Sequence, residues 1–419
     1  MKSVVGLFTV LFASPLQAGP CERAQVGLDA LVLELDGEWA IRLAPYVSSV
    51  GVGPLAGLVW AKDESRATWA AIVLGMSRQS NALSALREEP RGAAPMTRLG
   101  RALGLLALGD GAGTGSIAEA IENGSPEQRR LVAQVLGKQR TMRAGALLAP
   151  LLRDPDPEAR LWAARRGDWW KPQRARKALE ELADWPEPEI HRPAARTLAT
   201  RRIHGRWLRV LPLPERARFD ARRLNREASV AALRSALKEV DALAIPSALG
   251  VAAAAGVKTP ILKRIVGDRA PGELFMLRWL EGDPEALAGI AQVDAPNAKN
   301  VIVLLFAYSG GDSSRLKLTK EKSSELVPSF ERFIVTKTVD DVVGSWAIRA
   351  LDRLEPNAAL ALARTRVLGP EGIGQRSAMR VIGRHGDSPV EVLLAGERSR
   401  DKATRAVALR AALDVCRRL

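Results

Sequence analysis

The chain has 419 residues, a formal net charge of +15 and a sequence pI near 10.3. Aromatic residues make up only 5% of the chain and strand-like alternation is scarce, which argues against a β-rich fold and favours an all-helical one. The positive charge is concentrated between Arg129 and Glu227, where 24 Lys and Arg residues accompany 12 Asp and Glu residues. Such an excess indicates an anionic partner or a charged, solvated face.

Residues 1–18 have the layout of a secretory signal peptide. Lys2 precedes an apolar run from Val4 to Ala13, and Ala18 supplies the small residue before the expected cleavage point. The run is too short for a transmembrane helix, which needs about 20 apolar residues, and Pro20 before Cys21 argues against lipid attachment. We therefore expect export to the periplasm or secretion. The alternative is an ordinary N-terminal helix of a cytosolic protein.

Cys21 and Cys416 are the only cysteines. An extended repeat protein places its two ends far apart, so we expect these residues to exceed the Cα separation of about 4–7 Å that a disulfide requires. A bridge between them would count against an α-solenoid. Two isolated thiols and three histidines provide little material for a metal centre, and we predict no metal site.

One pattern recurs every 31 residues in the region of residues 65–209. Pro126, Pro157 and Pro188, each followed by Glu, stand one interval apart, and alanines and leucines keep the same spacing. Ser125 with Gln128 forms a predicted capping box before a helix. Each interval predicts a pair of antiparallel helices with one bare apolar side, which must stack on its neighbours to bury that side. Residues 19–64 are predicted to be atypical capping helices.

The segment Asp154-Pro-Asp-Pro-Glu-Ala-Arg-Leu-Trp-Ala-Ala164 resembles the HEAT repeat, in particular the short phycobilisome-lyase type. The resemblance implies an all-α fold, an α-solenoid of stacked helical hairpins, over most of the chain. Similar arrays serve as scaffolds, lyases, chaperones and DNA-repair enzymes, so the resemblance predicts the fold and says little about activity.

The pattern weakens after the main array. Residues 210–228 are predicted to be a basic linker rich in Pro and Arg, residues 229–308 an irregular helical section, and residues 309–324 a polar loop. Regular repeats resume over residues 325–419, where the 31-residue spacing returns.

The sequence contains no catalytic, cofactor-binding or metal-ligating constellation of recognisable type. It has no Gly-x-Ser-x-Gly elbow and no His-Glu-x-x-His helix. The glycine-rich segment from Gly109 to Gly115 follows a predicted helix and does not end in the Lys followed by Ser or Thr of a phosphate loop, so it is interpreted as the turn inside its repeat.

Arg98, Arg129 and Arg160 recur at the repeat interval, and His191 takes the next position. A row of cations at this spacing suits a phosphate backbone. The favoured interpretation is structural, with each arginine paired to carboxylates such as Asp154 or Asp156 that hold neighbouring repeats in place.

A second cationic set, off that register and interleaved with tryptophan, is the predicted partner-binding site. Its members are Arg165, Arg166, Lys171, Arg174, Arg176, Lys177, Arg201, Arg202, Arg206, Arg209, Trp169, Trp170 and Trp207, with Trp185 among them. Such a set suits an acidic protein groove, anionic lipid headgroups or nucleic-acid bases. The alternative assigns the tryptophans to the core and the arginines to a solvated face.

The favoured functional hypothesis is a non-enzymatic scaffold of the bacterial cell envelope that binds a protein partner with an acidic surface. Anionic lipid or nucleic acid is the less favoured partner, and no cofactor, metal or membrane span is predicted. One alternative is a nucleic-acid-binding protein that resembles the HEAT-like alkylpurine DNA glycosylases in architecture. The other is a bilin lyase-like protein, which rests on the repeat type alone.

Overall fold

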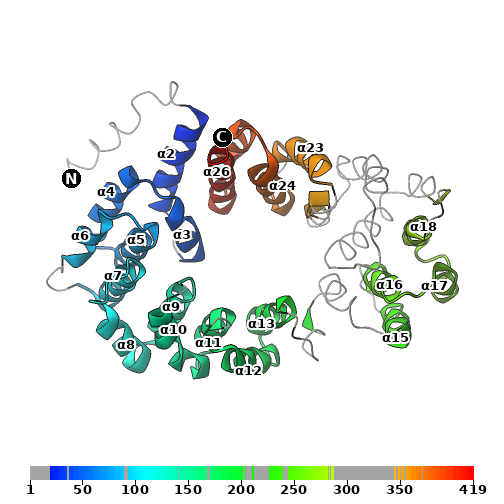
Figure 1. Cartoon of the computed structure of the whole chain (residues 1–419), viewed down its shortest axis with the longest axis horizontal. Helices are drawn as coiled ribbons and strands as arrows, with labels where there is room; N and C mark the ends of the chain where they lie inside the picture. Colours follow the sequence, from blue (N-terminus) through cyan, green and yellow to red (C-terminus); the bar gives the residue numbers. More distant parts are fainter. Residues whose placement is uncertain are drawn as a thin grey trace. The chain divides into compact units, whose positions relative to one another are not determined.

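The computed structural model describes residues 19–34, 37–88, 93–139, 141–167, 170–201, 203, 210–211, 226–238, 244–281, 283, 285–286, 344–345, 348–349, 351–352, 355–369 and 371–419. Over these residues the chain forms α-helices and two short 3-10 helices and contains no strand. The described residues therefore form an all-α fold built from helical hairpins, as the sequence predicts (Figure 1).

Two sets of helices alternate along the repeats. The first set is α5 (Glu64–Ser77), α7 (Pro95–Ala107), α9 (Pro126–Leu136), α11 (Pro157–Arg166) and α13 (Pro188–Thr200). The second set is α4 (Ser49–Leu58), α6 (Ala82–Arg87), α8 (Thr114–Asn123), α10 (Met142–Leu148) and α12 (Pro172–Ala183), with the 3-10 helix η2 (Pro150–Arg153) after α10. Each helix of the first set begins 31 residues after the one before, so helix starts follow the interval read in the sequence.

Side-chain caps mark the starts of α9 and α11. Ser125 and Gln128 form the predicted capping box, with the Ser125 N–H donating to Gln128 Oε1 at 2.8 Å and the Gln128 N–H donating to Ser125 Oγ at 3.3 Å. At the next interval Asp156 accepts the Ala159 N–H at 2.8 Å. Proline then occupies the first helical position, where its missing N–H costs no hydrogen bond.

The core of the repeats is made by the apolar stripe of each helix. Ala133, Ala164 and Ala195, one from each of three successive first-set helices, are fully buried. Leu148 and Leu179 of the second set are fully buried as well. Complete burial of a leucine contributes about 1.5–3 kcal/mol relative to exposure. Stacking against neighbours therefore stabilises each hairpin, which has too little core of its own.

Helices α5 and α7 pack with their backbones in direct contact. A Cβ placed on Gly75 would stand 2.1 Å from the Gly104 carbonyl oxygen, and one on Gly104 would stand 2.4 Å from the Ala71 carbonyl oxygen. A Cβ on Gly100 would stand 2.7 Å from the Thr68 carbonyl oxygen. Real Cβ atoms do not approach so near, so glycine is required at these positions for the two repeats to stack.

The described chain divides into two compact units. Unit 1 contains the chain up to Val135 together with the part from Ile382 onward, and unit 2 contains Leu136–Val381. Both chain ends therefore belong to unit 1. Its remaining elements are α2 (Pro20–Val32), α3 (Gly37–Leu43), the 3-10 helix η1 (Ala44–Tyr46), the end of α24 (Ile373–His385), α25 (Val390–Arg398) and α26 (Lys402–Cys416).

The expectation of two distant free cysteines is wrong. Cys21 in α2 and Cys416 in α26 form a disulfide, with Cα atoms 5.8 Å apart. The reason is that α2 and α26 pack side by side in unit 1, so the first and last helices cover one another (Figure 1). The repeats remain helical hairpins, so the bridge corrects the separation assumed for the chain ends and leaves the fold class intact.

Polar contacts add to this pairing of the ends. The Tyr46 hydroxyl donates to Asp414 at 3.2 Å, and the guanidinium of Arg417 lies 4.2 Å from the centroid of the Tyr46 ring. Glu34 lies 3.6 Å from Arg405. Because α2 and α26 also bury Leu28, Val32 and Val415, apolar contact and the disulfide act on the same helix pair.

Asp29 of α2 fixes the start of α4. Its carboxylate accepts the Ser48 N–H at 3.1 Å and the Ser48 hydroxyl. Ser48 in turn caps α4 by accepting the Gly51 N–H at 3.2 Å. A side chain on Gly51 would collide with this carboxylate. The position of α4 in unit 1 is therefore set by a polar cluster at its N-terminus.

Unit 2 continues beyond α13 with further helices. They are α15 (Arg226–Ala236), α16 (Ala244–Ala254), α17 (Thr259–Val266), α18 (Pro271–Leu280), α23 (Pro356–Val367) and the first part of α24. Helices thus occur in the predicted irregular section. The predicted polar loop lies outside the described residues, as do residues 212–225 of the predicted linker and residues 1–18 of the predicted signal peptide.

Candidate functional site

Part of the arginine ladder belongs to the framework of the repeats. Arg160 in α11 lies 3.6 Å from Glu181 in α12 and stacks over the Trp185 ring at 5.2 Å. Arg129 in α9 donates to the Gly124 carbonyl oxygen at 2.6 Å, at the end of α8. These contacts join helices within the repeats, in agreement with the structural interpretation. The carboxylate beside Arg160 belongs to Glu181, whereas the sequence analysis named Asp154 and Asp156 as examples of carboxylates that pair with the ladder.

His191 continues the ladder in a structural role. Its Nδ1 lies 2.8 Å from the Trp185 carbonyl oxygen. A carbonyl oxygen only accepts, so Nδ1 carries the proton in this contact. The imidazole thereby holds the turn before α13, and the same turn supplies the indole that stacks on Arg160.

Two members of the predicted partner-binding set, Arg165 and Arg201, make contacts inside the protein. Arg165 stacks on Trp162 of its own helix, with its guanidinium carbon 4.8 Å from the ring centroid. Arg201 donates to the Ala164 and Arg165 carbonyl oxygens at 3.2 and 2.6 Å. This places a cation at the C-terminus of α11, which the helix dipole favours. Arg201 therefore ties the end of α13 to the end of α11.

The other described members of the set line the outer side of α12 and its approach. Lys171, Arg174, Arg176 and Lys177 are exposed, whereas Arg166 and Trp170 are partly buried. Arg176 pairs with Glu180 at 2.7 Å. The remaining predicted members, Trp169, Arg202, Arg206, Trp207 and Arg209, lie outside the described residues. The structure thus brings together one compact basic face, at the start of α12.

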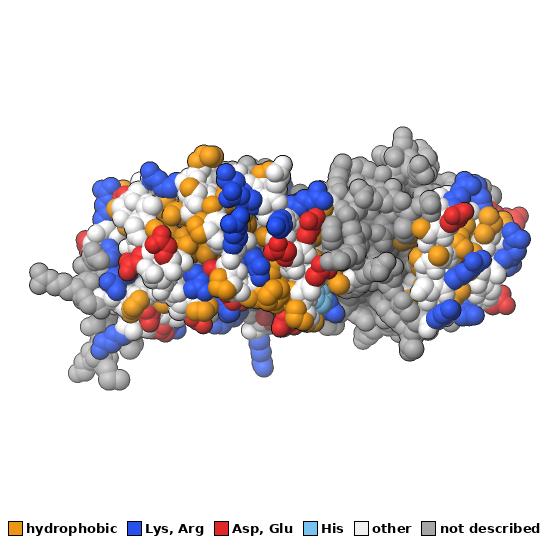
Figure 2. Space-filling model, turned by 90° about the horizontal axis from the view of Figure 1, so that it is seen from below, with side chains coloured by type: hydrophobic (Ala, Val, Ile, Leu, Met, Phe, Trp, Pro, Cys, Tyr) orange, Lys and Arg blue, Asp and Glu red, His pale blue; other side chains and the backbone are white. Residues whose placement is uncertain are grey.

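We call Lys171, Arg174, Arg176 and Lys177 the α12 basic face. The helix buries Ala175, Ala178, Leu179 and Leu182 on its opposite side, so the α12 basic face points to solvent. Lys and Arg side chains gather over this part of the repeats in Figure 2, with Asp and Glu side chains beside them. The α12 basic face is cationic, and the surface around it carries both positive and negative side chains.

The charges of α12 run against its helix dipole. Lys171 at the N-cap and Arg174 in the first turn bring positive charge to the positive end of the dipole, and no acidic residue stands in the first turn. Glu180, Glu181 and the C-cap Asp184 bring negative charge to the negative end. Each misplaced charge costs about 0.3–1 kcal/mol near a helix end. This arrangement disfavours the helix, which points to a role outside stability.

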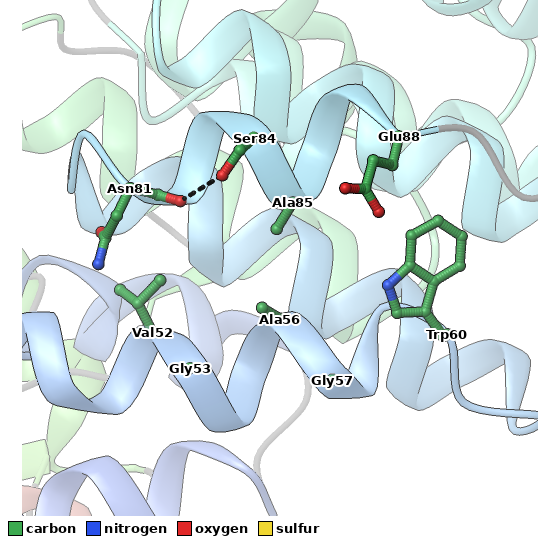
Figure 3. Close-up of a pocket in the computed structure, with 9 residues that line it drawn as sticks. All are labelled: Val52, Gly53, Ala56, Gly57, Trp60, Asn81, Ser84, Ala85 and Glu88. Carbon is green, nitrogen blue, oxygen red and sulfur yellow. Dashed lines mark hydrogen bonds between the residues drawn. The ribbon is translucent and has the colours of Figure 1, made fainter.

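Sequence reasoning missed a groove in unit 1, between α4 and α6. It has a volume of about 370 Å³, and its lining includes Val52, Ala56, Trp60, Asn81, Ala85 and Glu88 (Figure 3). Small residues shape it, because Gly53 and Gly57 of α4 leave open the space that larger side chains would fill. The glycine spacing in α4 was the available signal.

Metal-ligating side chains are dispersed over the described residues. No group of three or more His, Cys, Asp or Glu side chains within them is arranged to hold a metal ion. The glycine-rich segment at Gly109 connects α7 to α8, as the turn interpretation requires, and Gly109 adopts a φ of +89°. None of the helices in the described part of the chain has the length and apolar character needed to cross a membrane.

The comparisons with known proteins agree with the repeat architecture. The family model for HEAT repeats matches residues 114–199, which include α8 to α13. No curated protein matches the sequence. The phycobilisome-lyase subtype stays a prediction.

Two solved structures are similar over 98% of this chain. One is a chain of the S. pombe condensin Cnd3-Cnd2 subcomplex, with 12% identity and a TM-score of 0.28. This chain covers 62% of that chain, less than two thirds of its length. The other is an engineered protein, 98% covered, with 16% identity and a TM-score of 0.25. Similarity at this level carries no argument about function.

Proposed function

Residues 114–199 are HEAT repeats, and on that premise we propose that the protein is a non-enzymatic scaffold whose α12 basic face binds an acidic protein partner. HEAT repeats typically mediate protein interaction. The observation that carries the proposal is the charge order of α12, where exposed cations sit at the helix end that disfavours them. A partner that carries carboxylates offsets this cost when it docks.

The contacts around α12 support a preformed docking face. Arg160 with Glu181, and Arg201 with the end of α11, hold the helices on both sides of α12. The cations of the α12 basic face are therefore displayed on a fixed helix, which lowers the ordering cost of binding. Arg174 and Lys177 have no ionic partner among the described residues, so a ligand need not displace one.

We further propose that the protein acts outside the cytoplasm, in the cell envelope. Two observations support this: the signal-peptide layout of residues 1–18 and the Cys21–Cys416 disulfide. Disulfides persist in oxidising compartments and are rare in the cytosol. N-terminal sequencing of the protein purified from cells tests the proposal. A mature chain that begins at Gly19 with no free thiol is expected, and a chain that retains Met1 with two free thiols contradicts it.

Site-specific photo-crosslinking in cells tests the partner. A photoreactive residue at Gln173, an exposed position in α12, is expected to give one dominant crosslinked protein with an acidic surface. The charge reversals Lys171→Glu, Arg174→Glu and Lys177→Glu should remove this crosslink. A photoreactive residue at Ser116 on α8 is the control and should not give the product.

The same charge reversals separate the protein partner from nucleic acid. Binding to phosphate would show a steep dependence on salt concentration, because each neutralised phosphate releases counterions. Duplex DNA that binds with a steep salt slope lost in the reversed variant would contradict the acidic-protein proposal and support the nucleic-acid alternative. We expect only weak DNA binding at physiological salt.

A further inference from the structure

The groove between α4 and α6 has a polar end with a distinct chemistry. Trp60, just after α4, is 41% exposed, although an indole of this size is usually well covered. Figure 3 shows the Glu88 carboxylate beside the Trp60 ring, at the same end of the groove. An exposed indole face and a carboxylate are the two groups that attract an organic cation most strongly.

The carboxylate of Glu88 is not used inside the protein. The neighbouring Arg87 turns to the next repeat, where its Nε lies 3.0 Å from Asp110. The Glu88 side chain forms no hydrogen bond or ion pair with the described residues. The same holds for the side chain of Lys62, two positions after Trp60 in the sequence. The negative charge at the end of the groove is therefore available to a ligand.

The two helices that form the groove add to this negative potential. In Figure 3 both run from the Val52 and Asn81 end toward the Trp60 and Glu88 end. Helix α4 ends at Leu58 and α6 ends at Arg87, so their C-terminal ends point to the same place. A helix C-terminus carries a partial negative charge of about half an electron, which attracts cations.

The floor of the groove suits an aliphatic chain. Val52, Ala56 and Ala85 line it, and Gly53 and Gly57 leave it shallow and open along α4. Asn81 and Ser84 provide polar groups on one rim, and Ser84 donates to the Asn81 carbonyl oxygen at 3.1 Å. A lysine or arginine stem can lie on the apolar floor while its charged head reaches Trp60 and Glu88.

We propose that this groove binds a Lys or Arg side chain presented by a partner polypeptide. The polypeptide source follows from the openness of the groove, which lies at the surface along Val52, Ala56 and Trp60 and is not an enclosed cavity. The proposed site lies in unit 1 and carries the charge opposite to the α12 basic face in unit 2. It stands independently of the function proposed for α12.

A titration of the full chain with short peptides tests the proposal. The chain is labelled with fluorotryptophan, and the Trp60 signal is assigned with Trp60→Phe. The peptide acetyl-Ala-Ala-Lys-Ala-Ala-amide should shift the Trp60 fluorine signal, and the same peptide with acetyl-lysine should not. Glu88→Gln should weaken binding by about fivefold, since an exposed charge contact contributes up to about 1 kcal/mol.

Matched variants decide whether the groove itself is responsible. Glu122→Gln removes an exposed carboxylate near the C-terminus of α8 and should leave binding unchanged. The Glu88→Gln variant should unfold at the same temperature as the wild type, because its carboxylate has no internal partner. An unshifted Trp60 signal, or equal shifts from the lysine and acetyl-lysine peptides, overturns the proposal. Tetramethylammonium that binds as tightly as the lysine peptide overturns the polypeptide source.

Discussion

Cys21 and Cys416 are bonded to one another although 395 positions of the sequence separate them. The bond joins α2 to α26, the first and last described helices, and both belong to unit 1. A cross-link that closes so long a loop restricts the unfolded chain more than the folded one, in the chain-entropy account. The disulfide therefore protects the packing of the chain ends.

Reduction of this disulfide should destabilise unit 1. Cys21→Ser with Cys416→Ser is expected to lower the free energy of unfolding by about 2–5 kcal/mol. Thermal unfolding with and without reductant measures the effect, and the double variant is the control because reductant has nothing to cleave in it. A wild-type transition temperature that is the same with and without reductant, when the intact mass shows that the reductant has cleaved the disulfide, would contradict the stabilising role.

Substitution of Gly104 should disrupt the contact between α5 and α7. A methyl group there meets the Ala71 carbonyl oxygen at 2.4 Å, so Gly104→Ala forces the helices apart. We expect a loss of about 1–3 kcal/mol from overpacking. Gly115→Ala in α8 is the matched control, since nothing lies within 4 Å of a Cβ there. That change should stabilise the protein by about 0.5–1 kcal/mol through helix propensity. Denaturant titration should show a lower free energy of unfolding for Gly104→Ala and a higher one for Gly115→Ala than for the wild type.

Alanine substitutions at two equivalent N-cap positions should change the free energy of unfolding by different amounts. Asp156 accepts the Ala159 N–H, whereas Glu187, one interval later, makes no side-chain cap bond. Asp156→Ala is expected to cost about 1 kcal/mol, and Glu187→Ala should be close to neutral. Chemical denaturation measures both. Equal losses would mean that the cap bond does not determine where α11 starts.

Charge reversal on α12 should preserve or raise stability. Glu at positions 171 and 174 places negative charge at the N-terminal end of the helix, which favours it by about 0.3–1 kcal/mol per residue. Amide hydrogen exchange in α12 should therefore be unchanged or slower in Lys171→Glu with Arg174→Glu. Faster exchange in α12 would show that these cations stabilise the helix, and the argument for a binding role would fail.

The helix starts could be predicted from sequence because their causes are local. Pro126 and Pro157 each follow a residue suited to an N-cap position, Ser125 and Asp156, and one turn of chain contains the whole signal. The burial of Ala133 and Ala164 followed from the same spacing. The structural interpretation of Arg160 was also accessible, because its position in the repeat places it beside the next helix.

The pairing of the chain ends and the groove could not be predicted in the same way. Cys21 and Cys416 are 395 positions apart in the sequence, and no single repeat carries a signature of their pairing. The groove at Trp60 is the space that the side chains of α4 and α6 leave unfilled, and α5 separates these two helices in the sequence. The α12 basic face was predicted from composition, but Arg165 and Arg201 had to be seen in contact before they could be assigned to the framework.

Photo-crosslinking from Gln173, compared between the wild type and the Lys171→Glu, Arg174→Glu, Lys177→Glu variant, tests the scaffold proposal most directly. The proposal predicts one dominant crosslinked acidic protein for the wild type and none for the variant, with both chains folded to the same extent. The same crosslinked protein at equal yield from both chains would contradict a docking role for the α12 basic face.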